Sequence, residues 1–228
     1  KLLEVSTKNK MINSDDFYSF KFEMEEEGKS VDTYYKNGKK LSKEIWEVES
    51  ETTIKFDKSK SICKITAESE SLHEKESGKE ITEVDLTQYY QCDSKALYHI
   101  FDDEKLYEKY EIANPADAVA TEAFRQPIAL ITAFSKWIGF ADAYYIDDNV
   151  FTMEMIQDRE DESVTKASKT VYQLVIEDDK IQYFEEEETL IKEVNLETET
   201  KNSLTWKFEK DDVSLKEVNL EKYLKISD

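Results

Sequence analysis

The sequence predicts an α+β fold: one large, highly curved antiparallel sheet (half-barrel) of about 10 strands, with two helices packed on its concave face. Segments of alternating polar and apolar residues run through most of the 228 residues, a period that is typical of β-strands. Nine of the 12 alanines and both prolines lie between Ala113 and Ala143, which indicates a helical insert. Because no Pro-, Gly- or Ser-rich linker divides the chain, we expect residues 1–228 to form a single domain.

The first half of the chain reads as a short helix followed by a series of strands. Residues 1–11 predict the helix, and alternation then begins at Tyr18, Phe20, Phe22 and Met24. Asn37-Gly38 predicts a two-residue hairpin turn, since both residues tolerate positive φ. Further strands are predicted at 31–35, 45–48, 53–56, 61–67, 81–92, 97–101 and 106–112.

The alanine-rich insert predicts two helices. Asn114 is a good N-cap, and Pro115 suits the first helical position. Pro127 would break a continuous helix, so we expect helices at roughly 115–125 and 127–139. The second is apolar on nearly all sides and is therefore expected to be covered on nearly all sides. Two interpretations stay open: core packing under the sheet, or a lid over a lipid-like ligand.

The second half returns to alternating segments. Strands are predicted at 151–155, 172–176, 181–184, 190–196, 204–208 and 213–215, and residues 157–168 are expected to form an acidic loop. Residues 220–226 form either a last strand or a tail.

The net charge of −21 argues against two classes of partner. Nucleic acid and anionic membrane surfaces would both repel the chain, and the charge favours a monomer. The longest uncharged run, Gln126–Ser135, is shorter than the roughly 20 residues of a membrane span. The chain opens at Lys1 without a signal segment, so we expect a mature product whose signal or anchor lies upstream.

The two cysteines form a testable pair. If Ser77-Gly78 is a two-residue turn, paired positions sum to 155, and Cys63 then lies opposite Cys92. A disulfide in an oxidising compartment and two buried free thiols are both compatible with this register. A metal site is not expected, because there is no CxxC motif and neither His73 nor His99 has a ligand spacing.

No motif indicates catalysis, and no cofactor is expected. The chain has no G-x-S-x-G motif, we expect His73 to be exposed, and His99 shares a strand face with apolar residues. The acidic clusters lack the ligand spacing of a calcium loop and are predicted to be solvated turns; they lie at 102–104, 147–148, 158–162 and 185–188. We therefore expect a binding protein rather than an enzyme.

Aromatic and apolar residues on the sheet and on the second helix could line a ligand site. The candidates are Phe20, Phe22, Trp46, Tyr90 and Trp206 from the strands, and Leu130, Phe134 and Trp137 from the helix.

The order of elements resembles the lipoprotein-carrier fold of the LolA, LppX and LprG type. The similarity lies in the helix at 2–11 before the strand at 17–24, in the insert at 113–143 that would plug the half-barrel, and in the strands after 151. Members of that group carry lipids, lipoproteins or lipidated glycans across a cell envelope. The resemblance implies an extracytoplasmic bacterial binding protein, lipid-anchored at the outer face of the membrane or secreted, that holds a lipid or acyl group between sheet and helices. The alternative is a surface protein–protein interaction module with a filled core and no ligand.

Overall fold

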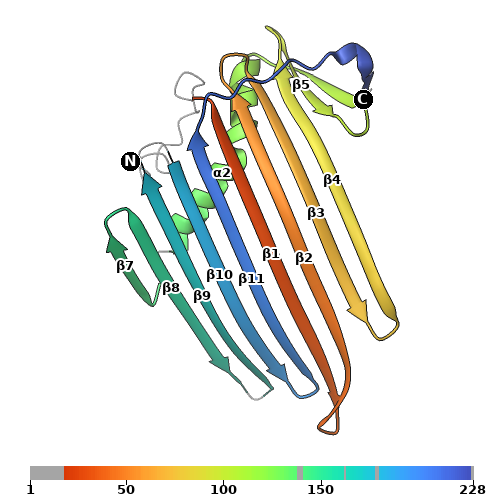
Figure 1. Cartoon of the computed structure of the whole chain (residues 1–228), viewed down its shortest axis with the longest axis vertical. Coiled ribbons are helices and arrows are strands. Elements are labelled where there is room, and N and C mark those ends of the chain that lie inside the picture. Colours follow the sequence, from red (N-terminus) through yellow and green to blue (C-terminus); the bar gives the residue numbers. More distant parts are fainter. Residues whose placement is uncertain (1–17, 138–140, 162, 178–179, 227–228) are drawn as a thin grey trace.

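A computed structural model describes residues 18–137, 141–161, 163–177 and 180–226. The helix expected at 1–11 lies outside these residues. Within them, 12 strands form one sheet in the order β12-β6-β5-β4-β3-β2-β1-β11-β10-β9-β8-β7 (Figure 1). The large, open, curved antiparallel sheet agrees with the prediction; the helix count does not, because the described residues contain one α-helix.

The first six strands form a meander in chain order. They are β1 (Phe20–Lys36), β2 (Lys39–Asp57), β3 (Ile62–Lys75), β4 (Gly78–Cys92), β5 (Ala96–Phe101) and β6 (Leu106–Glu111). The predicted turn at Asn37-Gly38 is confirmed: it joins β1 to β2 with φ values of 53° and 72°.

The second meander contains β7 (Ala143–Asp147), β8 (Val150–Glu160), β9 (Val164–Glu177), β10 (Lys180–Glu193) and β11 (Leu196–Lys210). β11 pairs with β1, where Phe22 lies opposite Phe208, so this seam joins the two meanders. Near the C-terminus, the two-residue β12 (Leu224–Lys225) pairs with β6 in parallel.

Several strands are much longer than predicted. β1 runs through Glu25-Glu26-Glu27, and β10 runs through 185–188, which was wrongly predicted to be a turn. Residues 157–168 are mostly strand rather than a long loop, since β8 ends at Glu160 and β9 begins at Val164. The reason is that these stretches are rich in charged and polar residues and lack the apolar alternation on which the strand predictions depended.

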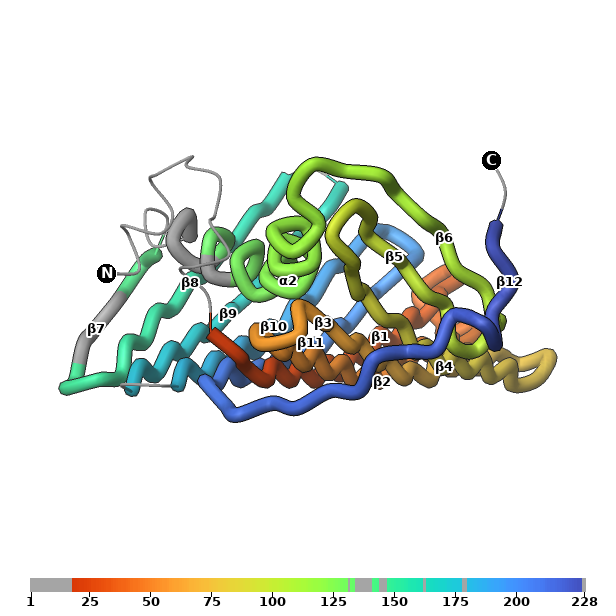
Figure 2. The backbone as a smooth tube through the Cα atoms, turned by 90° about the horizontal axis from the view of Figure 1, so that it is seen from above, coloured from red at the N-terminus to blue at the C-terminus, as the bar shows by residue number. Residues whose placement is uncertain are grey.

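The helix α2 (Pro115–Trp137) packs on one face of the sheet, as Figures 1 and 2 show. It begins at Pro115, as predicted, but it continues through Pro127 instead of breaking into two helices. A proline inside a helix removes one backbone hydrogen bond and crowds the preceding turn. The ring of Pro127 is fully buried, and this burial offsets part of that cost.

The core lies between α2 and the part of the sheet that α2 covers, which is at the top in Figure 1. Phe20 is fully buried, with its ring centroid 4.4 Å from Phe124 of α2, 4.8 Å from Phe208 and 5.8 Å from Phe56. Phe20, Phe22 and Phe56 follow the period of two that places alternate side chains on one face.

The C-terminal segment runs along the ends of the strands from β11 to β12 (Figures 1 and 2). Residues 213–215, predicted to be a strand, lie in this segment and form none. Buried Asp57 accepts a hydrogen bond of 2.9 Å from the Leu215 amide, and the Gln91 side chain exchanges two hydrogen bonds with the Val218 backbone. The segment ends with the short 3-10 helix η3 (Leu220–Lys222) and β12.

Candidate functional site

Three of the predicted ligand-lining residues come together in the core. Phe20 and Phe22 are fully buried, and Trp206 is 3% exposed. The rings of Trp206 and Phe22 are 6.0 Å apart, and those of Trp206 and Tyr183 stack at 5.2 Å. These side chains contact one another, so this part of the interface is occupied by the protein itself.

The remaining candidates are more dispersed. Leu130 and Tyr90 pack against the edge of the core, and Tyr90 stacks on His99 at 4.3 Å. Burial, together with the nearby Glu122 carboxylate, raises the pKa of Tyr90 to about 12. Phe134 and Trp137 belong to α2, but their side chains lie outside the described part of the structure.

Trp46 does not join the core. It lies farther along β2 and is 47% exposed, with its ring stacked on His73 at 3.3 Å. The pairing of Trp46 with His73 across β2 and β3 explains this contact. The stack also leaves the His73 side chain only 15% exposed, so the prediction of an exposed histidine is wrong.

His99 is half-buried beside Glu108. Burial lowers its pKa, while Glu108 at 3.5 Å from Nδ1 opposes that shift. Its Nε2 atom is buried without a hydrogen-bond partner among the described residues. The ring also contacts Phe101, with ring centroids 4.1 Å apart.

The predicted register of the two cysteines is wrong. The β3–β4 turn is formed by Glu76 and Ser77, and Gly78 already belongs to β4 with φ of 144°. Paired positions therefore sum to 153, so Cys63 faces Tyr90. Cys92 pairs instead with Leu97 of β5, and both thiols are free.

Beyond the helix, both faces of β1 to β4 carry exposed side chains. On the face that carries α2, the uncovered part presents Trp46, Val48 and Val84, which are 47%, 38% and 53% exposed. On the opposite face, exposed acidic residues form two rows across β1 to β4. One row contains Glu27, Glu49, Glu70 and Glu83, and the other contains Glu25, Glu51, Glu68 and Asp85.

The negative charges of the two acidic rows are not balanced by ion pairs among the described residues. None of the eight carboxylates forms an ion pair with another residue in the described ranges. Like charges directly opposite each other on neighbouring strands are destabilising. A shallow hollow of about 270 Å³ lies over the rows between β2 and β4. No set of three or more acidic, His or Cys side chains in the described chain is arranged to hold a metal ion.

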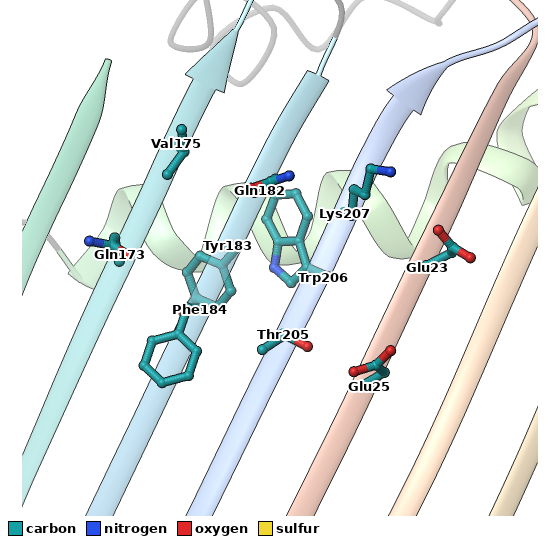
Figure 3. Close-up of a pocket in the computed structure, with 10 residues that line it drawn as sticks. All are labelled: Glu23, Glu25, Gln173, Val175, Gln182, Tyr183, Phe184, Thr205, Trp206 and Lys207. Atoms are coloured by element: carbon teal, nitrogen blue, oxygen red, sulfur yellow. The ribbon is translucent and has the colours of Figure 1, made fainter. Parts of the chain in front are cut away.

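A second hollow, of about 350 Å³, lies on the face opposite α2 (Figure 3). Charged, polar and aromatic side chains line it together: Glu23, Glu25, Gln173, Val175, Gln182, Tyr183, Phe184, Thr205, Trp206 and Lys207. Lys207 is engaged by Glu209 at 2.6 Å, and this hydrogen bond raises its pKa. The hollow is open to solvent on this face of the sheet.

The sequence interpretation missed one feature of β4. Only Gln88–Cys92 pair with β5, so the rest of the strand forms an edge of the sheet. The signal was present in the segment lengths, because the predicted strand at 81–92 is followed by strands of only five and seven residues. Such short strands cannot cover their whole neighbour.

Comparison with known proteins assigns no family. No protein-family model matches the chain, and no curated protein matches it. Among solved structures, a lipovitellin described by its lipid–protein interactions has 7% identity and a TM-score of 0.34, over 90% of this chain and 27% of the other. The translocator domain of the autotransporter NalP from Neisseria meningitidis has 6% identity and a TM-score of 0.23, over 84% of this chain and 89% of the other. The chain thus spans about a quarter of the lipovitellin chain, and neither structure is a LolA-type carrier.

Within the described ranges, no helix combines the length and hydropathy that a membrane-crossing helix requires.

Proposed function

We propose that this chain is a protein-binding module that engages its partner through the part of the sheet that α2 leaves uncovered. One observation carries the proposal: in the described part of the interface, residues of α2 pack directly against the strands, while the part of the sheet beyond the helix carries exposed side chains. Val119, Ala120 and Ala123 of α2 are fully buried against the core. This packing supports the interaction module that the sequence analysis left as the alternative.

A carrier that encloses a lipid is the weaker candidate. Ligand sites of that kind are pockets of roughly 300–1,000 Å³ that bury most of the ligand. In the described part of the interface, Val119, Ala123 and Phe124 of α2 instead belong to the same buried cluster as the aromatic residues of the strands. We therefore assign α2 the role of closing the core.

The first test separates the two candidates with an acyl probe. Dansylaminoundecanoic acid is titrated into the purified chain and its fluorescence is followed. We expect no saturable signal, because the described residues of α2 pack directly on the aromatic residues of the strands. Saturable binding with one site per chain, displaced by palmitate, would contradict the proposal.

The second test locates the binding surface. A photoreactive benzoylphenylalanine is placed at Val48 or Val84 on the uncovered sheet, and at exposed Thr121 of α2 as the control. Each variant is irradiated in an extract of the organism that makes the protein. We expect the two sheet positions to capture one identifiable protein that the Thr121 variant does not capture. That protein is then purified and must bind the unmodified chain saturably; failure to bind would refute the proposal.

An extracytoplasmic, lipid-anchored location remains a prediction from the sequence. Mass spectrometry of the protein isolated from its own host would detect an attached lipid.

A further inference from the structure

The uncovered half of β4 is an edge with unpaired backbone groups. Residues 78–86 pair with β3 on one side, and no described segment pairs with them on the other (Figure 1). Their side chains are exposed as far as Asp85. Such an edge is a ready template for an added strand.

The turn between β5 and β6 fixes where the edge begins. The Asp102 amide donates to the Thr87 carbonyl at 2.9 Å, and the Thr87 amide donates to the Asp103 carboxylate at 2.6 Å. The backbone groups of Thr87 therefore point away from β3. Because this direction alternates along a strand, the same must hold for every second residue before it, namely Lys79, Ile81, Glu83 and Asp85.

The opposite edge of the sheet is more protected. On β8, the short β7 pairs as far as Glu154, and the Asp142 carboxylate accepts a hydrogen bond from the Ile156 amide at 2.5 Å. The β8 residues whose amides stay unpaired at this edge are then Asp158 and Glu160. β4 thus offers the longer docking edge.

The charges beside the edge select the partner. Glu83 and Asp85 end the two acidic rows, and no cation in the described structure neutralises them. A second copy of this chain would bring the same excess of negative charge, since its net charge is −21. A segment with Lys or Arg at alternate positions would instead place its cations about 4.8 Å from the row ends. Its other side chains would then lie beside Thr82 and Val84 on the opposite face.

We propose that β4 residues 78–86 bind an extended cationic segment of a partner protein as an added strand. The alternate cations lie over Glu83 and Asp85, and apolar residues between them contact Val84. This proposal rests on the proposed function and specifies its site and the chemistry of its partner.

The test uses a fluorescein-labelled heptapeptide of alternating Lys and Val, measured by fluorescence polarisation. The control peptide has the same composition with its Lys residues in one block. We expect saturable binding of the alternating peptide, at least about tenfold tighter than the block peptide, because only alternation places every cation on the acidic face. Equal affinities, or no saturation, would overturn the proposal.

Protein variants separate the backbone contribution from the charge contribution. Ile81→Pro removes one outward amide without changing the charge, and proline is tolerated at such an edge position. Glu83→Gln with Asp85→Asn removes the two row-end charges. Each is expected to weaken binding by about tenfold, whereas the matched edge control, Asp158→Asn with Glu160→Gln, should change it by less than about twofold. Circular dichroism verifies the fold of each variant, and wild-type affinity in the folded Ile81→Pro protein would refute strand addition.

These outcomes are distinct from those of the proposed function. The alternating peptide could fail to bind while the Val48 variant still captures a partner that binds the purified chain. In that case the proposal of strand addition at β4 is wrong, and the proposed function as a protein-binding module stands. Saturable binding of the acyl probe would contradict the proposed function itself.

Discussion

Replacing Phe20 by alanine tests whether the space between α2 and the sheet is filled. The side chain is fully buried, and three phenylalanine rings surround it at 4.4–5.8 Å. Burying roughly 150 Å² of aromatic surface at about 25 cal/mol per Å² corresponds to about 4 kcal/mol. This agrees with the roughly 3–5 kcal/mol measured for Phe-to-Ala changes in protein cores. We therefore expect Phe20→Ala to lower the free energy of unfolding by about 3–4 kcal/mol.

The assay is urea unfolding, followed by circular dichroism and tryptophan fluorescence. Exposed Val84→Ala is the control, with an expected change within about 0.5 kcal/mol. Phe124→Ala removes the α2 side of the same contact. Because the two rings share one packed site, the double variant should cost about 1 kcal/mol less than the sum of the single variants. A loss below about 1 kcal/mol for Phe20→Ala would refute the reasoning, because it would mean that the site already contains empty space.

Three further predictions concern the turn, an acidic residue and the thiols. Gly38→Ala should cost about 1 kcal/mol in urea unfolding, because φ is +72° and nothing lies within 4 Å of the added Cβ; a neutral effect would contradict backbone strain. Burial raises the pKa of Glu185 above its ordinary value, a hydrogen bond from Tyr183 partly opposes this, and Glu187 and Glu26 add to the rise. The folded chain then binds this proton more tightly than the unfolded chain, so stability falls as pH rises through the folded pKa. Glu185→Gln should therefore raise the urea midpoint at pH 7 but not at pH 4. Equal effects at the two pH values would refute the raised pKa of Glu185. Burial raises the pKa of both thiols, most at fully buried Cys63, so iodoacetamide should modify Cys92 first, and a non-reduced mass lower by two hydrogens would contradict free thiols.

The sequence predicted strands best where α2 covers them. Phe20, Phe22 and Met24 alternate cleanly because one of their faces is buried and the other is solvated. Farther along the same strand, Glu25-Glu26-Glu27 carries no apolar alternation, since water lies on both faces. The alternation that predicts a strand reflects burial of one of its faces. The acidic extensions of β1 and β10 lack this alternation, so they could not be predicted from it.

The two local errors had different causes. The break expected at Pro127 follows a rule for isolated helices. In the folded chain α2 continues through Pro127, whose ring is buried, and this tertiary burial cannot be read from the local sequence. The β3–β4 turn was predicted at Ser77 and Gly78, but Glu76 and Ser77 form it. Moving a turn by one residue shifts the partner of every strand residue by two positions. The acidic rows could not be predicted either, because their alignment depends on the registers of β1 with β2, β2 with β3 and β3 with β4. The β4 edge, in contrast, could have been inferred from the short lengths of β5 and β6.

The seam between β1 and β11 has a consequence for biosynthesis. Each meander is built from neighbours in the sequence, but the strand that flanks β1 on its second side begins only at Leu196. Until the ribosome has released that segment, the seventeen residues of β1 keep one side unpaired. Slow, non-local closure of this kind favours association with other nascent chains, so a chaperone that shields β1 during translation would raise the yield of folded protein.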